Sequence, residues 1–113
     1  MTPEALDDAC RALPAVTKVV QWGGADVYKV GGRIFAIAGQ GGGFSFKVTD
    51  IAYEALTESG RARPAPYLTR AKWVLFDNPA DLDDAEIVAW LATVHALIAA
   101  KLTRAQRREL GLA

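Results

Sequence analysis

The sequence lacks almost every side chain on which metal and catalytic sites depend. Among 113 residues it has one histidine, His95, and one cysteine, Cys10. Zinc takes three or four ligands from such side chains, so a zinc site has no ligand set here. Ser45, Thr49 and Ser59 have no histidine base at a recognisable spacing, and nucleophilic catalysis needs one. We therefore expect no enzyme, no metal and no cofactor.

Net charge and long apolar runs are absent as well. Thirteen Lys and Arg residues balance thirteen Asp and Glu residues, so the molecule as a whole has no net field toward nucleic acid or an anionic membrane. No apolar run approaches the ~18 residues of a membrane span. A single cysteine in an apolar helical stripe forms no internal disulfide and is typical of a reducing compartment. We expect a cytoplasmic protein with no membrane role.

The composition that is present is that of an ordinary globular domain. Apolar residues make up 51% of the chain and charged residues 23%, unlike the polar, charge-rich mixture of disordered chains. A chain of this length builds one core, and the sequence has no repeat, low-complexity tract or interior linker. We expect a single domain over residues 1–113.

Capping signals and apolar spacing predict helices at both ends, with short β-rich runs between them. Thr2-Pro3 is a helix-start signal, and Gly31-Gly32 separates two β-rich runs as the turn of a tight hairpin does. Glycines interrupt residues 14–26, which we expect to be an ordered connection. The expected elements are a helix over 3–12, strands over 27–30, 33–37 and 44–48, a helix capped by Asp50 and ended by Gly60, an edge strand or merely an extended segment within 61–68, a strand over 72–76, and a long helix from about 85 to 102 with a last turn or two through 110.

This order of elements predicts an α+β fold. Strands that follow one another through short turns pair antiparallel, and the apolar stripes of the helices need an apolar sheet face to cover. We expect a two-layer sandwich with the order α-β-β-β-α-β-β-α, in which the helices cover one face of an antiparallel sheet.

Five short motifs occur in a fixed order along the chain. They are VYKVGGRIFA over 27–36, FKV over 46–48, PYL over 66–68, RAKW over 70–73, and LDD over 82–84 before the helix that ends in Lys101-Leu102. Together they resemble the motifs of the MmcQ/YjbR family, which are small bacterial proteins often described as DNA-binding through a proposed double-wing arrangement. The resemblance implies the same fold and DNA as a partner, and it carries over no catalytic residue. The family often has His at the position of Lys72 and a Ser-Tyr pair at Val94-His95, so the chain departs from it there.

Basic residues gather before and within the expected strand over 72–76. If that strand lies near the strand over 44–48, the cations make one basic surface that contacts phosphates, with Tyr67 and Trp73 able to stack on bases. The alternative is an ordinary solvated edge strand, where cations discourage aggregation. The candidate nucleic-acid contacts are Lys47, Arg61, Arg63, Arg70 and Lys72.

The sequence thus leaves two functions open. One is a weak, salt-dependent nucleic-acid-binding module. The other is a protein-interaction or self-associating domain that uses the open sheet face or Trp22, which lies in an irregular glycine-flanked stretch. The glycines between 39 and 43 precede a strand rather than a helix, so they predict a flexible hairpin and not a phosphate loop. His95 is expected in a half-buried aromatic position.

Overall fold

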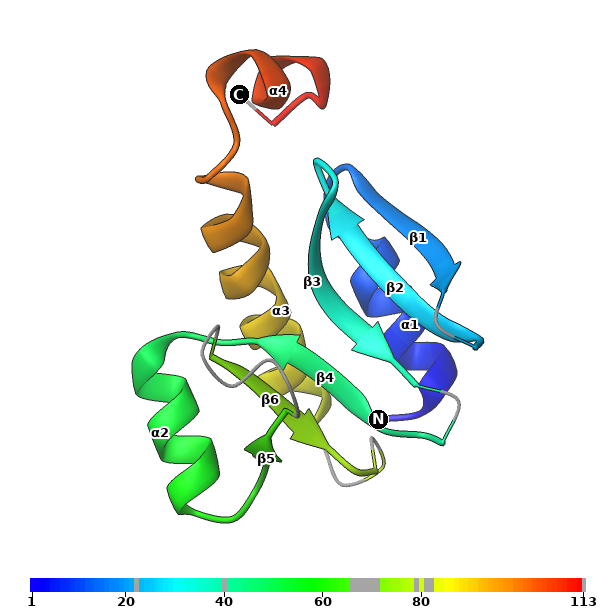
Figure 1. Ribbon diagram of the computed structural model, residues 1–113, viewed down its shortest axis with the longest axis vertical. Helices are drawn as coiled ribbons and strands as arrows, with labels where there is room; N and C mark the ends of the chain where they lie inside the picture. Colours follow the sequence, from blue (N-terminus) through cyan, green and yellow to red (C-terminus); the bar gives the residue numbers. More distant parts are fainter. Residues whose placement is uncertain (22, 40, 66–71, 79, 81–82, 113) are drawn as a thin grey trace.

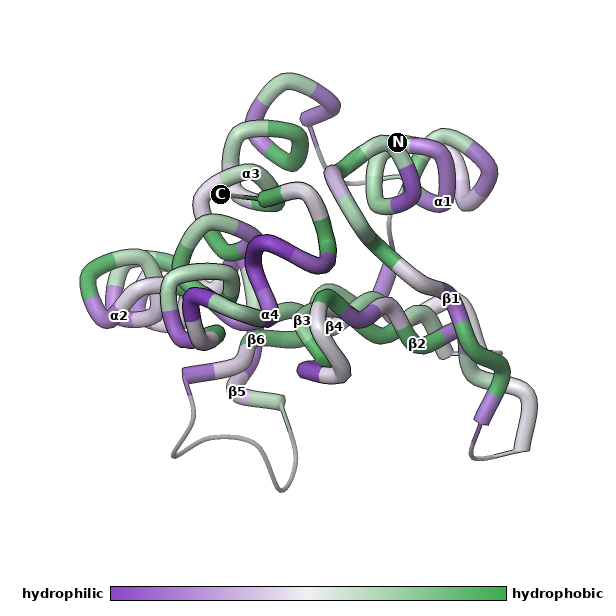
Figure 2. The backbone as a smooth tube through the Cα atoms, turned by 90° about the horizontal axis from the view of Figure 1, so that it is seen from above, coloured by the Kyte–Doolittle hydropathy of each residue, from purple (hydrophilic) through white to green (hydrophobic). Residues whose placement is uncertain are grey.

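The computed structural model of the chain describes residues 1–113 except 22, 40, 66–71, 79, 81–82 and 113. The described strands form one antiparallel sheet in the order β1-β2-β3-β4-β6-β5, and the helices lie on one side of it (Figures 1 and 2). The predicted α+β fold with a helix-covered antiparallel sheet is therefore confirmed. The helices are α1 (Pro3–Arg11), α2 (Asp50–Glu58), α3 (Asp84–Ala99) and α4 (Arg104–Glu109), and the strands are β1 (Val16–Gln21), β2 (Ala25–Val30), β3 (Arg33–Ala38), β4 (Phe44–Lys47), β5 (Arg63–Pro64) and β6 (Trp73–Phe76).

The expectation of a connection over 14–26 is wrong, because that segment contains β1. Val16 pairs with Val30, and the register runs without a break to the pair formed by Gln21 and Ala25. Gly23 and Gly24 adopt positive φ angles of 76° and 106°, so they turn the chain between two strands instead of preventing a strand. β1 is an edge strand with mostly exposed residues, which is why its apolar pattern is weak.

Two helix boundaries also differ from expectation. Thr49, not Asp50, caps α2, since its hydroxyl accepts a hydrogen bond from the Ala52 amide at 3.1 Å. The C-terminal segment is a separate helix rather than the end of the long one. Thr103 caps α4 through a capping box with Gln106, which starts a new helix and changes the direction of the chain.

The basic surface expected from the sequence requires the strand over 72–76 to lie near the strand over 44–48, and the corresponding strands β6 and β4 are neighbours. β6 pairs directly with β4, and Lys47 lies opposite Trp73. Beyond β6, the edge strand expected within 61–68 is confirmed as the two-residue β5, which contains Pro64. A proline at this edge removes one ladder donor and keeps the strand short.

Aromatic rings fill the space between the sheet and α3. The rings of Phe44, Phe46 and Phe76 stack on one another, and Trp90 of α3 stacks on Phe46 and Phe76 with centroids 5.9 and 6.0 Å apart. Such contacts add about 0.5–1.5 kcal/mol per pair beyond the burial of area. Because side chains alternate along a strand, Ser45 and Lys47 lie on the opposite face.

Candidate nucleic-acid interface

Two of the arginines predicted to contact nucleic acid, Arg61 and Arg63, are paired with carboxylates. Arg63 donates two hydrogen bonds to Asp77, at 3.0 Å from Nε and 2.6 Å from the guanidinium NH2 group. This pairing raises the pKa of Arg63 and lowers the pKa of Asp77. Arg61 donates to Glu86 at 2.6 Å and lies 5.6 Å from the centroid of the Trp90 ring. Both arginines therefore present little unopposed positive charge.

The two lysines of the predicted set, Lys72 and Lys47, have other surroundings. The Lys72 ammonium is 4.8 Å from the centroid of the Tyr53 ring, on α2. Lys47 is half-buried, and this burial, together with the charge of Lys101, lowers its pKa. Arg70 lies outside the described residues, as do Tyr67 and Trp22. Their role in binding stays a prediction.

Trp73 is unavailable for stacking on a base in this conformation. Its side chain is only 5% exposed, so most of its ring surface is already in contact with protein. The predicted set thus has neither a converged group of unpaired cations nor an open aromatic platform among its described members.

A second group of cations lies in the C-terminal segment. Residues 101–108 carry four basic side chains and no acidic one. None of the four forms an ion pair with any residue that the structure describes. Three of them line an open hollow of about 490 Å³ together with Leu112. The four are Lys101, Arg104, Arg107 and Arg108.

The fold holds this short helix firmly in place. The Leu112 amide donates to the Arg107 carbonyl at 2.7 Å, and Gly111, with φ of 73°, reverses the chain after α4. Leu110 and Leu112 then pack against the core. Because this turn anchors the end of α4, the backbone that carries the arginines does not need to be ordered at the moment of binding, which lowers the cost of association.

Two other parts of the chain bring cations to the same place. Leu102 is buried, and a Cβ atom on Gly31 would lie 2.7 Å from its side chain. The β2–β3 turn therefore contacts the start of the C-terminal segment (Figure 1), and Arg33 follows this turn. Lys47 lies close enough to Lys101 for the two charges to interact. We call this group the basic end: Arg33, Lys47, Lys101, Arg104, Arg107 and Arg108.

The acidic residues at the start of α3 lie far from the basic end, whereas Asp50 interacts with Lys47 and Glu109 is the last residue of α4. Asp83, Asp84 and Glu86 lie at the other end of α3, where Asp83 accepts a hydrogen bond from the Glu86 amide. The 16 residues of α3 span about 24 Å at ~1.5 Å per residue. Charges are screened over about 8 Å at physiological ionic strength. The carboxylates at the far end therefore do little to weaken the field of the basic end.

Sequence reasoning missed the basic end, although a signal was present. Four cations within eight residues, followed by Glu109 alone among acidic residues, form a basic run. The segment was interpreted as the solvated last turns of a helix, and the net charge of zero argued against a basic surface. The sequence does not show the contact between Gly31 and Leu102, which places the turn before Arg33 beside these cations.

His95 and Cys10 have structural roles. His95 is buried, its Nε2 lies 2.7 Å from the Pro14 carbonyl oxygen, and its ring meets Phe35 edge to face. The predicted half-buried aromatic position is in fact a buried one. Cys10 is a free, buried thiol, and burial raises its pKa to about 12. Among the described residues no three His, Cys, Asp or Glu side chains group as metal ligands.

The model of the YjbR family matches residues 11–97 of the chain. The chain belongs to the YjbR family. This confirms the resemblance seen in its motifs. The crystal structure of the Deinococcus radiodurans protein DR2400, described with a DUF419 domain, is similar with a TM-score of 0.82 and 24% sequence identity, covering 99% of this chain and 89% of that chain. No match was found among curated proteins.

The family match bears on the basic end in one respect. It stops at residue 97, so α4 lies outside the part of the chain that the family model describes. The structural likeness, which covers nearly the whole chain, concerns the fold alone. In the part of the chain that the structure describes, no helix is both long and apolar enough to span a membrane.

Proposed function

We propose that this YjbR domain is a nucleic-acid-binding module whose phosphate contacts come from the basic end. The observation that carries the proposal is the set of four cations on residues 101–108, which lack ion pairs within the described chain and three of which line an open hollow. A polyanion that covers them releases its counterions, which is the main source of non-specific affinity for DNA. Lys47 belongs both to this surface and to the set predicted from sequence.

The geometry favours a nucleic acid over an anionic membrane. A membrane-binding helix needs an apolar face open to lipid. In α4 and the turn after it, Leu110 and Leu112 are partly buried against the core instead, and of the two only Leu112 lines the hollow beside the arginines. The contact of the β2–β3 turn with Leu102 places a hairpin beside the basic helix, which supports a surface long enough to follow a phosphate backbone.

The test compares two charge-neutralised variants, which lose three and two positive charges. In the first, Arg104, Arg107 and Arg108 are changed to Gln. In the control, Arg61 and Arg63 are changed to Gln. Binding of labelled duplex and single-stranded DNA is measured by fluorescence polarisation at ~50 mM salt, where electrostatic binding is strong. We expect at least a ten-fold loss for the first variant and less than a three-fold loss for the control.

Two results would contradict this proposal. If the control loses as much affinity as the first variant, the surface predicted from sequence carries the contacts. If the wild-type protein binds neither DNA nor RNA at low salt but binds vesicles that contain phosphatidylserine, the partner is a membrane. Far-ultraviolet circular dichroism of each variant separates loss of binding from loss of fold.

A further inference from the structure

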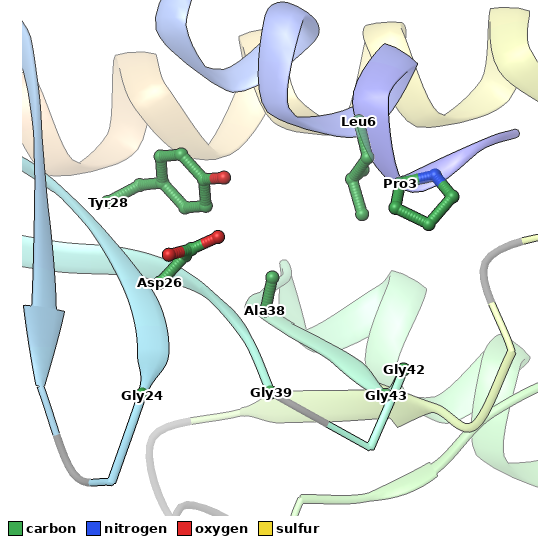
Figure 3. Close-up of a pocket in the computed structure, with 9 residues that line it drawn as sticks. All are labelled: Pro3, Leu6, Gly24, Asp26, Tyr28, Ala38, Gly39, Gly42 and Gly43. Atoms are coloured by element: carbon green, nitrogen blue, oxygen red, sulfur yellow. The ribbon is translucent and has the colours of Figure 1, made fainter.

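A pocket of about 240 Å³ lies at the other end of the molecule, between α1 and the sheet (Figure 3). Its walls come from α1, from the helix-facing side of β2 and β3, and from the glycine-rich turn that follows β3. This volume suits a compact small molecule rather than a macromolecule. The lining residues are Pro3, Leu6, Gly24, Asp26, Tyr28, Ala38, Gly39, Gly42 and Gly43.

The hydrogen-bond donors around this pocket are largely used within the protein. The amides of Gly24, Gly39 and Gly42 donate to the carbonyls of Gln21, Gly43 and Gly39, at 3.2, 2.9 and 3.1 Å. The Tyr28 hydroxyl donates to Asp7 at 2.6 Å. Burial raises the pKa of Tyr28, so this proton stays in place. A glycine wall of this kind is a poor cradle for phosphate, which needs free amides.

The acceptors, in contrast, are available. A tyrosine hydroxyl that has donated its proton still accepts through its oxygen lone pairs. Asp26 is half-buried, and its carboxylate points into the pocket beside Tyr28 (Figure 3). Its one ion pair among the described residues is with Lys18, at 3.7 Å. A ligand that enters the pocket therefore meets acceptors that need a donor.

Lys18 neutralises Asp26 only weakly, because its shorter contact is to another carboxylate. The Lys18 ammonium lies 2.9 Å from Asp7, which also pairs with Arg11 at 3.4 Å. Asp7 thus has two cationic partners, and Asp26 shares one of them at a longer distance. Lys18 is also not among the residues that line the pocket. The pocket wall accordingly carries a carboxylate whose charge is incompletely balanced.

We propose that this pocket binds a small organic cation, an ammonium or guanidinium group on a short apolar body. The cation donates to the Asp26 carboxylate and the Tyr28 hydroxyl oxygen. The apolar body contacts Leu6, Pro3 and Ala38, which present hydrocarbon on the other side of the pocket (Figure 3). The site is separate from the basic end and does not depend on nucleic-acid binding.

The experiment is a titration of the ¹⁵N-labelled protein followed by ¹H–¹⁵N correlation spectra. The probes are n-butylammonium, the neutral n-butanol, the anionic butyrate, and Ca²⁺. We expect saturable shifts of the Gly24, Gly39, Gly42 and Gly43 amides with n-butylammonium, at least ten-fold weaker binding of n-butanol, and none of butyrate. Equal binding of n-butanol would show that the pocket recognises only the apolar body of the ligand. The same shifts with Ca²⁺ would show that the pocket binds metal ions. Either result overturns the proposal.

Three variants locate the site. Asp26→Asn keeps the shape and removes the charge, so n-butylammonium should bind at least ten-fold more weakly. Ala38→Leu keeps the charge of Asp26 and fills part of the pocket, so it should weaken the binding of n-butylammonium to a similar extent. Asp8→Asn, an exposed position on the same helix as Leu6, is the matched control and should bind as the wild type does. Unchanged binding to Asp26→Asn would rule the site out, and its own spectrum shows whether it is folded.

Discussion

The two ends of this protein differ in charge and in what their polar groups can still bind. At the basic end, three arginines of α4 without ion pairs in the described chain line an open hollow. At the other end, Asp84 lies 3.4 Å from the N-terminal amine, and Asp26 and Tyr28 present acceptors to a partly open pocket. The net charge of zero is a sum over the whole chain and describes neither end by itself. A ligand meets only one of them, because the separation exceeds the screening length.

This comparison shows that charge balance over a whole chain is a weak guide to what one surface binds. Along α3 the acidic residues lie in the first turn and Lys101 follows the last one. That order also stabilises the helix, because carboxylates favour the positive end of its dipole and cations the negative end. Helix stability and charge separation thus have the same cause here.

The largest expected difference between the ends is in the effect of salt. A surface that makes about four phosphate contacts should lose about 100-fold in DNA affinity between 50 and 200 mM NaCl, because log K falls with log salt at a slope of ~0.9 per contact. The pocket holds one partly shielded charge, so binding of n-butylammonium should fall by less than about three-fold. Fluorescence polarisation and NMR titrations at both salt concentrations measure this. Equal salt effects at the two sites would contradict the proposed difference in charge between the basic end and the pocket.

A smaller effect is expected from the contact that joins the β2–β3 turn to the basic end. Gly31 and Gly32 have φ angles of 58° and 80°, but only Gly31 faces Leu102. Alanine at either position should lower the free energy of unfolding by about 1–2 kcal/mol, because a residue with a Cβ atom is strained in the left-handed conformation. Gly31→Ala should cost about 1–2 kcal/mol more, because its Cβ crowds the Leu102 side chain. Urea unfolding of both variants measures the difference, and equal losses would show that the contact contributes no stability.

The smallest effect concerns the carboxylate beside the pocket. Burial by itself raises the pKa of Asp7, but hydrogen bonds from Lys18 and Tyr28 outweigh it and hold the pKa below its ordinary value of 3.8. The charged form is therefore favoured by folding. Asp7→Asn should lower the free energy of unfolding at pH 6 by about 0.5–1.5 kcal/mol, because the amide oxygen of Asn still accepts these hydrogen bonds and only the contribution of the charge is lost.

The sign of the pH dependence follows from the lowered pKa. The contribution of Asp7 is fully present above pH 3.8 and is lost as the pH falls through the pKa of the folded state. The wild type and Asp7→Asn should therefore converge in stability in acid. Chemical unfolding between pH 6 and pH 2 measures this, with Asp8→Asn as the control. A difference that persists at pH 2 would assign the effect of Asp7 to packing.

Local signals were sufficient for most of the fold. The Gly31-Gly32 turn, the alternation from Phe44 to Lys47 and the caps at Thr2 and Asp83 each act over a few residues, so the sequence reveals them directly. β1 was missed because an edge strand buries little and leaves a weak pattern. The start of α4 was missed because the capping box at Thr103 lies inside an otherwise continuous helical pattern.

The candidate sites were less predictable, because they depend on contacts between distant residues. Arg61 and Arg63 look like free cations in the sequence, and their partners Glu86 and Asp77 lie 25 and 14 positions away. In the same way, Asp26 and Leu6 face one pocket only because α1 packs over β2 and β3. Which distant residues come into contact depends on how the helices pack across the sheet. Residue types alone do not specify that packing.

By itself, then, the sequence determined the family, the elements with strong local signals, and the absence of a histidine and cysteine set for metal chemistry. The tertiary structure alone decided which cations are paired with carboxylates and which are left without such partners in the described chain. It also decided that acceptors rather than donors face the pocket. The physical reason is that charge and hydrogen-bonding capacity belong to single residues, whereas their neutralisation depends on neighbours that only folding brings within a few ångströms.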